Sequence, residues 1–251
     1  MRSVIDAIVL CGGAGTRLRS VTGEAPKSLA AIGDRPFLDI LVNQLRRHGF
    51  ERVILAVGYQ RDLIRSHFAS RSHDLSLEYS IESTPLGTGG ALRNAADLVK
   101  SAAVLIMNGD SYTDADLSSF VAQHRESRAD VSVIVVPTDG RVDCGLVAVD
   151  PQGRVLGFKE KQSASGMQYV NAGIYVVDKK ILYEMPPNQR ISLEEEVFPR
   201  LLAQGKNIRS FHHSGLCIDI GTPERYLSAQ ETLANVEPDG FVSVQKGRQE
   251  A

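Results

Sequence analysis

The stretch AIVLCGGAGTRL fills residues 7–18, and it decides the fold of the chain. Its first four residues are apolar and indicate a buried strand, and three glycines follow within four residues. A cation, Arg17, comes next, and a second cation, Lys27, lies ten residues further on. Because glycine has no Cβ, its backbone N–H groups can turn towards an anion. The stretch therefore predicts a loop that wraps a polyphosphate at the end of the first strand.

Two other glycine loops fit this stretch poorly. A Walker loop needs glycine directly before its lysine, but Pro26 precedes Lys27. A dinucleotide loop needs Gly-x-Gly-x-x-Gly, and although Gly13 and Gly15 fill the first two places, Leu18 fills the third. The pattern thus excludes the kinase and dehydrogenase loops. A tight strand-to-helix turn without a ligand stays as the structural alternative.

The composition narrows the classes of protein further. With 251 residues, 43% of them hydrophobic and 23% charged, the chain can build a globular core. A formal net charge of −2 gives no general basic field, so we expect no nucleic-acid partner. No apolar run is long enough for a membrane span or a signal peptide, so we expect a cytoplasmic protein without membrane contact. Cys11, Cys144 and Cys217 lack the spacing of a zinc ribbon or a disulfide framework.

Short apolar runs alternate with amphipathic segments in the first half of the chain. The predicted strands cover residues 5–10, 53–57, 77–81, 104–107 and 131–136. The predicted helices cover residues 37–45, 62–68, 90–99 and 116–125, with Gly49 suited to end the first of them. This alternation predicts a mostly parallel sheet with helices on its faces. Its ligand should lie at the carboxyl ends of the parallel strands.

The pattern changes after about residue 140. Residues 145–149 and 154–158 flank the turn sequence DPQG and predict a hairpin, and residues 170–177 predict a further strand. Ser192-x-x-Glu195 reads as a capping box, and Thr222-Pro223 reads as the start of another helix. We expect a Rossmann-like α/β domain over residues 1–235, with a mostly parallel mixed sheet and an antiparallel insert in its second half. A flexible tail is expected over residues 236–251.

Two aspartates are candidate metal ligands. The predicted strand 104–107 leads through Asn108-Gly109 into Asp110, and Asp219 lies at a second junction between a strand and a helix. A carboxylate at the end of a buried strand can hold Mg²⁺, which prefers oxygen ligands. A turn or helix N-cap role is the alternative for Asp110.

Four further segments carry polar residues that could touch a ligand. ESTPLGTGG over residues 82–90 joins a strand to a helix, and its glycines permit close backbone approach, although a flexible loop would look similar. NAG over residues 171–173 places glycine inside a strand, which often marks close approach of a ligand. KEK over residues 159–161 is, taken alone, a solvated charge run. His212-His213 could suggest a metal site, but neighbouring strand residues point to opposite faces, so we expect a structural or surface role for both.

Taken in order, these motifs resemble those of the sugar nucleotidyltransferases, which join a nucleoside triphosphate to a sugar 1-phosphate. The resemblance rests on LCGGAGTRL over residues 10–18 followed by Pro26-Lys27, and it covers roughly residues 5–230. It implies the GT-A type of Rossmann-like fold. Three departures from the family pattern are Arg19-Ser20 and Ser28, where proline is common, and Cys217, where tryptophan is common.

The resemblance also implies roles for particular residues. It assigns catalysis to Arg17, Lys27 and Asp110, and binding of Mg²⁺ to Asp110 and Asp219. The nucleotide-binding residues that it implies are Leu10, Gly12, Gly13, Gly15, Thr16, Arg17, Lys27, Glu82, Leu86, Gly87, Thr88, Gly89, Asn108 and Gly109. The residues implied for the sugar phosphate are Gly145, Glu160, Lys161 and Asn171.

The segment PLGTGG over residues 85–90 looks most like that of guanylyltransferases acting on manno-configured sugars, including heptose 1-phosphates. We therefore expect GTP and D-glycero-D-manno-heptose 1-phosphate to give GDP-heptose and pyrophosphate. GTP with mannose 1-phosphate and UTP with N-acetylmuramate 1-phosphate are alternatives within this class. A catalytically silent nucleotide-sugar sensor or regulatory subunit is the alternative from another class. Homo-oligomerisation is left open.

Overall fold

The structure is a computed structural model that describes residues 5–69, 75–138, 145–160 and 167–233. Within these residues the centre is a nine-stranded sheet, ordered β10-β9-β11-β6-β1-β4-β5, with β8 beside β11 and β12 beside β8. Its strands are β1 (Asp6–Leu10), β4 (Arg52–Val57), β5 (Ser76–Ile81), β6 (Ala103–Asn108), β8 (Val131–Val136), β9 (Gly145–Val149), β10 (Val155–Glu160), β11 (Met167–Asp178) and β12 (Ile208–His212). The predicted mixed α/β sheet is confirmed.

The strand directions divide the sheet into two halves. β6, β1, β4 and β5 are parallel, as the alternating pattern predicts. β11 runs antiparallel to β6, β8 and β9, and the predicted hairpin of β9 and β10 extends the sheet beyond it. The antiparallel insert is therefore part of the central sheet. The carboxyl ends of β1 and β6 lie side by side, because Leu10 pairs with Asn108.

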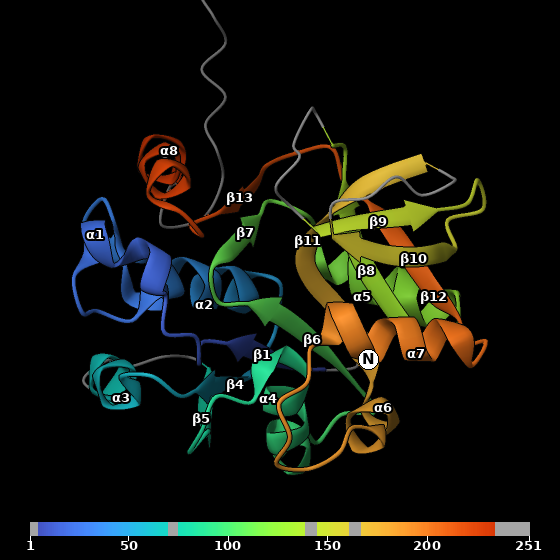
Figure 1. Ribbon diagram of the computed structural model, residues 1–251, viewed down its shortest axis with the longest axis horizontal. Helices are drawn as coiled ribbons and strands as arrows, with labels where there is room; N and C mark the ends of the chain where they lie inside the picture. The colour runs from blue at the N-terminus through green and yellow to red at the C-terminus, as the bar shows by residue number, and fades with distance from the viewer. Residues whose placement is uncertain (1–4, 70–74, 139–144, 161–166, 234–251) are drawn as a thin grey trace, which may run out of the picture.

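Helices cover both faces of the sheet (Figure 1). One face packs against α2 (Phe37–Arg47), α3 (Arg61–Ala69), α5 (Leu117–Glu126) and α8 (Pro223–Leu233). The other packs against α4 (Gly87–Ala95), α6 (Lys179–Glu184) and α7 (Phe198–Ala203). Side chains of β1 alternate between the two cores, with Ala7 and Val9 in one and Ile8 in the other, as strand geometry requires. No helix in the described ranges is both long and apolar enough to cross a membrane.

Several short elements complete the fold. The short helices are η1 (Thr16–Leu18), α1 (Arg19–Thr22), η2 (Lys27–Leu29), η3 (Ala96–Leu98) and η4 (Leu193–Val197). Two small sheets pair β2 (Ala31–Ile32) with β3 (Arg35–Pro36), and β7 (Ser111–Thr113) with β13 (Cys217–Asp219). The second of these joins segments more than a hundred residues apart along the chain, and it builds part of the site described below.

Two predicted helix starts differ in detail from the structure. α4 begins at Gly87, three residues before the predicted start at residue 90, and η3 replaces its predicted last turn. Ser192 Oγ accepts the N–H of Glu195, as a capping box requires, but the N–H of Ser192 donates to Glu196 rather than to Glu195. The first turn, η4, is a π-helix, which is wider than an α-helix. Glu196, one residue later than the capping box predicts, is therefore the side chain that reaches the N–H of Ser192.

A buried ion cluster joins the amino-terminal ends of three parallel strands. Arg52 Nη1 lies 3.0 Å from Asp6 Oδ2, and Arg52 Nη2 lies 2.6 Å from Glu78 Oε1. Only 10% of the Arg52 side chain and 6% of the Asp6 side chain are exposed. Asp6 Oδ2 also accepts the backbone N–H of Ser101, so this carboxylate is tied to two neighbouring segments.

Arg52→Met is expected to lower the free energy of unfolding by about 3–5 kcal/mol, because it leaves the Asp6 charge buried without its partner. Arg65→Met is the control, since Arg65 is 53% exposed and lies 3.8 Å from an exposed Asp62 carboxylate. That pair should contribute at most about 1 kcal/mol. Urea unfolding of both variants measures the difference. Equal, small losses would contradict a structural role for the Arg52 cluster.

Candidate active site

The glycine loop after β1 lies against Lys27. Gly15 has φ 56°, in the left-handed region that glycine adopts without strain. A Cβ at this position would lie only 2.8 Å from the Cβ of Lys27, so a larger residue would push the two segments apart. Lys27 then reaches across the end of the sheet, and its Nζ lies 2.6 Å from Asp110 Oδ2. Glycine is therefore needed here both for the turn and for the position of the lysine.

The two candidate metal ligands come together although they lie far apart in the sequence. Asp110 is separated from the end of β6 by Gly109 alone, and its backbone carbonyl accepts the N–H of Ile220 at 2.9 Å. Asp219 is the last residue of β13 and pairs with Ser111 of β7. Asp219 Oδ2 lies 2.7 Å from Arg225 Nη1, and its Oδ1 accepts the N–H of Gly221. Each carboxylate thus has one cationic neighbour.

The donor atoms at this place suit Mg²⁺. The Asp110 and Asp219 side chains are 37% and 36% exposed, and both line one cavity. Asn108 lines the same cavity, and its Oδ1 is buried without a hydrogen-bond partner among the described residues. Oxygen donors of this kind, completed by water and ligand oxygens, are what Mg²⁺ prefers. No group of three or more His, Cys, Asp or Glu suited to a metal occurs in the described part of the chain. Asp110 and Asp219 stay the predicted ligands of the ion.

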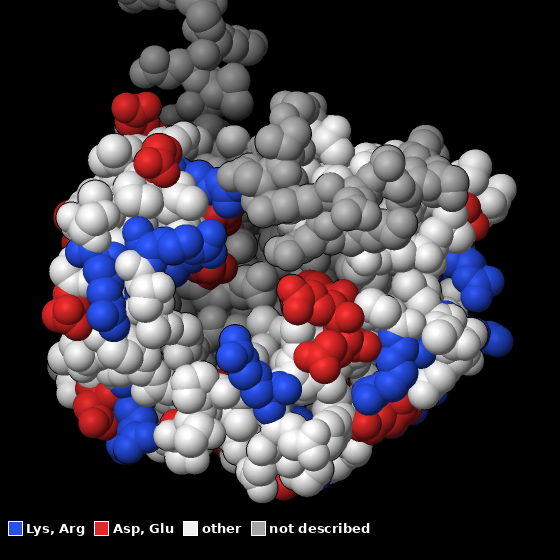
Figure 2. All heavy atoms as spheres, in the orientation of Figure 1, with Lys and Arg blue, Asp and Glu red and all other residues white. Residues whose placement is uncertain are grey.

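Two cavities meet at Lys27 and Asp110. The first has a volume of about 320 Å³ and lies between the glycine loop and the start of α4. The second has a volume of about 640 Å³ and lies between β11, β13 and η4. Lys27, Thr88, Asn108 and Asp110 line both. Figure 2 shows the hollow on this face, with basic side chains to its left and below it and acidic side chains on its right.

The structure gathers most of the predicted nucleotide residues around the first cavity. Those that line it are Leu10, Gly12, Gly13, Lys27, Glu82, Gly87, Thr88, Asn108 and Gly109. Arg17 lines the second cavity instead. Four predicted residues line neither cavity, namely Gly15, Thr16, Leu86 and Gly89. Leu86 and Gly89 instead make backbone hydrogen bonds with Ile191.

Glu82 places a carboxylate on the wall of the first cavity. Its side chain is buried, and its Oε2 accepts the N–H of Leu86 at 3.1 Å. Its Oε1 lies 3.0 Å from the place where a Cβ on Gly12 would be, so the glycine loop packs directly against this carboxylate. Burial raises the pKa of Glu82, and the hydrogen bond from Leu86 opposes that rise in part.

The glycines at the start of α4 serve the packing of the protein itself. Residues 189–192, here called the strap, run along this segment, and Ile191 exchanges backbone hydrogen bonds with Leu86 and Gly89. A Cβ on Gly87 would lie 2.7 Å from Ile191 O, and a Cβ on Gly90 would overlap Gln189 O. The close backbone approach expected from the sequence is therefore made by the strap. The sequence pattern alone could not show which partner fills that space.

A network of hydrogen bonds connects the two cavities. Tyr175 donates its hydroxyl to Glu194 Oε1 at 2.9 Å and accepts from Asn171 Nδ2 at 2.8 Å. Thr88 Oγ1 donates to the other Glu194 oxygen at 3.1 Å. Burial, together with the neighbouring Glu194 charge, raises the pKa of Tyr175, so its hydroxyl stays protonated. The start of α4 and the middle of β11 are thus joined through one carboxylate.

The second cavity contains predicted and unpredicted residues. Of the predicted set, Arg17, Gly145, Asn171 and Asp219 line it, whereas Lys161 and the side chain of Glu160 lie outside the described residues. Tyr175, Glu194 and Arg225 also line it, and the sequence analysis missed them. Tyr175 reads as a core strand residue, and Glu194 reads as an ordinary charge in the first turn of a helix.

The remaining residues singled out from the sequence have separate partners. His213 Nε2 lies 2.6 Å from Asp114 Oδ1, whereas His212 lies near Ser210, which agrees with a structural role for both histidines. Cys11 and Cys217 form no disulfide among the described residues, and burial raises the pKa of Cys11. Cys144 lies outside the described residues.

The sheet, the glycine loop after its first parallel strand and the carboxylate pair define a Rossmann-like α/β protein with a two-part cavity. The chain belongs to the nucleotidyl transferase family, whose model matches residues 6–236, and it is a nucleotidyltransferase. The resemblance seen in the sequence is confirmed.

Named relatives cover almost the whole chain. A D-glycero-alpha-D-manno-heptose 1-phosphate guanylyltransferase from Aneurinibacillus thermoaerophilus is 36% identical over 229 residues, which are 91% of this chain and 98% of the relative. A mannose-1-phosphate guanylyltransferase from Mycobacterium tuberculosis is 35% identical over 248 residues, which are 98% of this chain and 69% of the relative. The crystal structure of HddC from Yersinia pseudotuberculosis complexed with GMP-PN has a TM-score of 0.80 and 32% identity, covering 91% of this chain and 99% of HddC.

Proposed function

We propose that this enzyme is a sugar-1-phosphate guanylyltransferase. It transfers GMP from GTP to a manno-configured sugar 1-phosphate, with D-glycero-D-manno-heptose 1-phosphate as the first choice. The observation that carries the proposal is the meeting of two cavities at Lys27 and Asp110. The first cavity would take the nucleoside, the second would take both the pyrophosphate and the sugar phosphate, and the α-phosphorus would lie where the cavities join.

The reaction needs charge neutralisation more than it needs a base. A phosphate oxygen of the sugar 1-phosphate forms a bond to the α-phosphorus, and the bond from that phosphorus to the bridging oxygen breaks. Pyrophosphate then leaves with the electron pair. Because the nucleophile is already an anion, the task is to bring negative groups together and to stabilise the transition state. Mg²⁺ bound by Asp110 and Asp219 would supply positive charge next to the reacting phosphate.

The residues at the junction suit this task. Lys27 is 13% exposed and lies between the two cavities, where it would neutralise charge on the α-phosphate. Arg17 has no hydrogen bond or ion pair among the described residues, and it lines the second cavity, where it would bind the leaving pyrophosphate. Lys161 remains the proposed partner of the incoming sugar phosphate.

Glu82 supports guanine as the base. Guanine carries two neighbouring donor groups, N1–H and the N2 amino group, and a carboxylate can accept from both. Uracil offers one N–H between two carbonyl oxygens, which a carboxylate would repel. Glu82 is a buried carboxylate on the wall of the first cavity, so its pattern of acceptors fits guanine better than uracil. This argues against N-acetylmuramate 1-phosphate with UTP.

The relatives support a manno-configured acceptor. The heptose enzyme and the mannose enzyme named above act, by their names, on two sugars of that kind. In this chain the Asn171 amide and the Glu194 carboxylate line the second cavity, where they could bind sugar hydroxyls. Mannose 1-phosphate therefore remains the second candidate acceptor.

Pyrophosphate release tests the proposal across four nucleoside triphosphates and a panel of sugar 1-phosphates. We expect turnover with GTP together with D-glycero-D-manno-heptose 1-phosphate, and weaker turnover with mannose 1-phosphate. A reversed order of the two sugars would identify a mannose enzyme. Nucleotide binding without turnover for any pair would overturn the proposal in favour of a sensor.

A further inference from the structure

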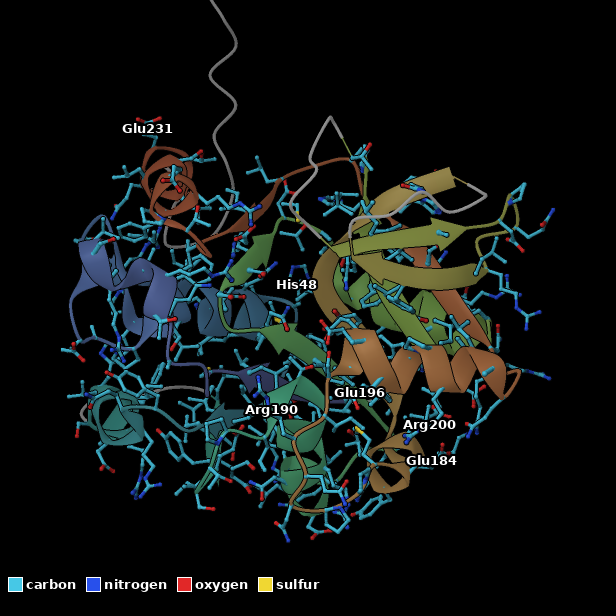
Figure 3. The ribbon with its side chains drawn as sticks, viewed as in Figure 1. His48, Glu184, Arg190, Glu196, Arg200 and Glu231 are labelled. Carbon is cyan, nitrogen blue, oxygen red and sulfur yellow. The ribbon has the colours of Figure 1, made fainter. Side chains whose placement is uncertain are left out.

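A cation that the proposed chemistry does not use lines the first cavity. Arg190 belongs to the strap, is exposed, and lies beside α4 in the view of Figure 3. It makes no hydrogen bond or ion pair with any residue that the structure describes. It lines the first cavity but not the second, which sets it apart from Lys27 and Arg17.

The backbone that carries Arg190 is fixed on both sides. Ile191 N donates to Leu86 O at 2.9 Å, and Ile191 O accepts from Gly89 N at 2.9 Å. The next residue, Ser192, caps η4. Gly87, Gly89 and Gly90 leave no room between α4 and the strap, because a Cβ on any of them would meet strap atoms. Arg190 is therefore held at the cavity by a firmly packed segment, although its own side chain has no protein partner.

We propose that Arg190 recognises the O6 and N7 edge of guanine, as the counterpart of Glu82. This inference rests on the proposed function. Guanine has acceptors on one edge, at O6 and N7, and donors at N1 and N2. A guanidinium can donate to both acceptors at once, and this is the commonest specific contact to guanine in nucleic-acid complexes. The Glu82 carboxylate and the unpaired Arg190 guanidinium line the same cavity, so together they offer groups complementary to both edges of the base.

A phosphate contact is the main alternative role for this cation. The cations at the junction and in the second cavity, Lys27 and Arg17, are already placed for the phosphates. Arg190 lies instead in the cavity that contains Glu82, and its strap packs on the start of α4. The arrangement therefore favours a contact with the base.

Calorimetric titration of the full chain with GTP, 7-deaza-GTP and UTP, each with Mg²⁺ and without a sugar phosphate, tests the proposal. In 7-deaza-GTP a C–H replaces N7, so one acceptor is lost. The unchanged protein should bind 7-deaza-GTP roughly tenfold more weakly than GTP. Arg190→Ala should bind GTP roughly ten- to a hundredfold more weakly, and it should no longer distinguish the two nucleotides.

Two further variants separate base recognition from a charge effect. Arg190→Lys keeps the charge but loses the planar fork, so it should behave like Arg190→Ala in the comparison with 7-deaza-GTP. Arg200→Ala removes an arginine of α7 that lines neither cavity, and its affinities should not change.

Three outcomes would overturn the inference. Arg190→Ala could keep the preference for GTP over 7-deaza-GTP, or it could lose affinity for GTP and UTP equally, which would indicate a phosphate contact. In either case the proposed function would still stand if the wild-type protein binds GTP more tightly than UTP. An unchanged protein that prefers UTP would overturn the proposed function and this inference together.

Discussion

Asp110→Asn is expected to lower kcat for pyrophosphate release by about a thousandfold or more while the protein stays folded. Asp110 lies where the two cavities meet, and its carboxylate holds Lys27 Nζ at 2.6 Å. Asparagine keeps the size of the side chain but removes the charge that would bind Mg²⁺ and orient the lysine. The side chain is 37% exposed, so its loss should affect the free energy of unfolding much less than it affects turnover.

A matched control makes this result interpretable. Asp62→Asn makes the same change on α3, where the side chain is 81% exposed and paired only weakly with Arg65. Its kcat should stay within about twofold of the unchanged enzyme, since the exposed pair carries little energy. Thermal unfolding of both variants shows whether the fold persists. Near-normal turnover in Asp110→Asn would rule out the proposed role of Asp110 in binding the metal.

Glu82→Gln is expected to remove most of the preference for GTP over UTP. The N–H of Leu86 needs an acceptor, so the glutamine oxygen should face Leu86 and its amino group should face the base. That amino group would then oppose the N1–H and N2 donors of guanine. Losing a bidentate contact to a base edge costs about 1–3 kcal/mol, so kcat/KM for GTP should fall roughly 5- to 150-fold. Parallel assays with UTP and with the surface variant Glu126→Gln show whether the loss is specific.

The same carboxylate gives the affinity for GTP a pH dependence. Burial raises the pKa of Glu82 above its usual 4.5. The charged form accepts from guanine, whereas the protonated form presents a donor to it. The affinity for GTP should therefore be highest at pH values above the raised pKa of Glu82, and it should fall as the pH drops through that pKa. Glu82→Gln should lack this transition, and an identical pH profile in the variant would show that another group titrates.

Local patterns in the sequence were sufficient to predict the residues of one wall of the site. An apolar run, three glycines and an arginine predict β1 and its loop, and aspartates after strands predict Asp110 and Asp219. These features depend on neighbours within about ten residues. The parallel pairing of β1 with β6 then brings the glycine loop close to Asp110, because the ends of adjacent parallel strands lie side by side.

The other wall depends on contacts between distant segments. Leu193 N donates to Thr88 Oγ1 across 105 positions of the chain, and this contact helps to bring Glu194 to the cavity. Arg190 reaches the first cavity only because the strap packs on the glycines of α4. In the sequence, these residues look like ordinary surface charges next to a helix start. No local sequence pattern distinguishes Arg190 and Glu194 from such surface residues, so their place at the cavities could be found only from the structure.

Phosphorus NMR of the complete reaction tests the central claim most directly. The enzyme is incubated with GTP, Mg²⁺ and D-glycero-D-manno-heptose 1-phosphate, and all phosphorus-containing products are quantified. The account predicts GDP-heptose and pyrophosphate in equal amounts, with none formed by Asp110→Asn on the same time scale. Formation of inorganic phosphate without a sugar nucleotide, or faster formation of a UDP-sugar when UTP replaces GTP, would contradict it.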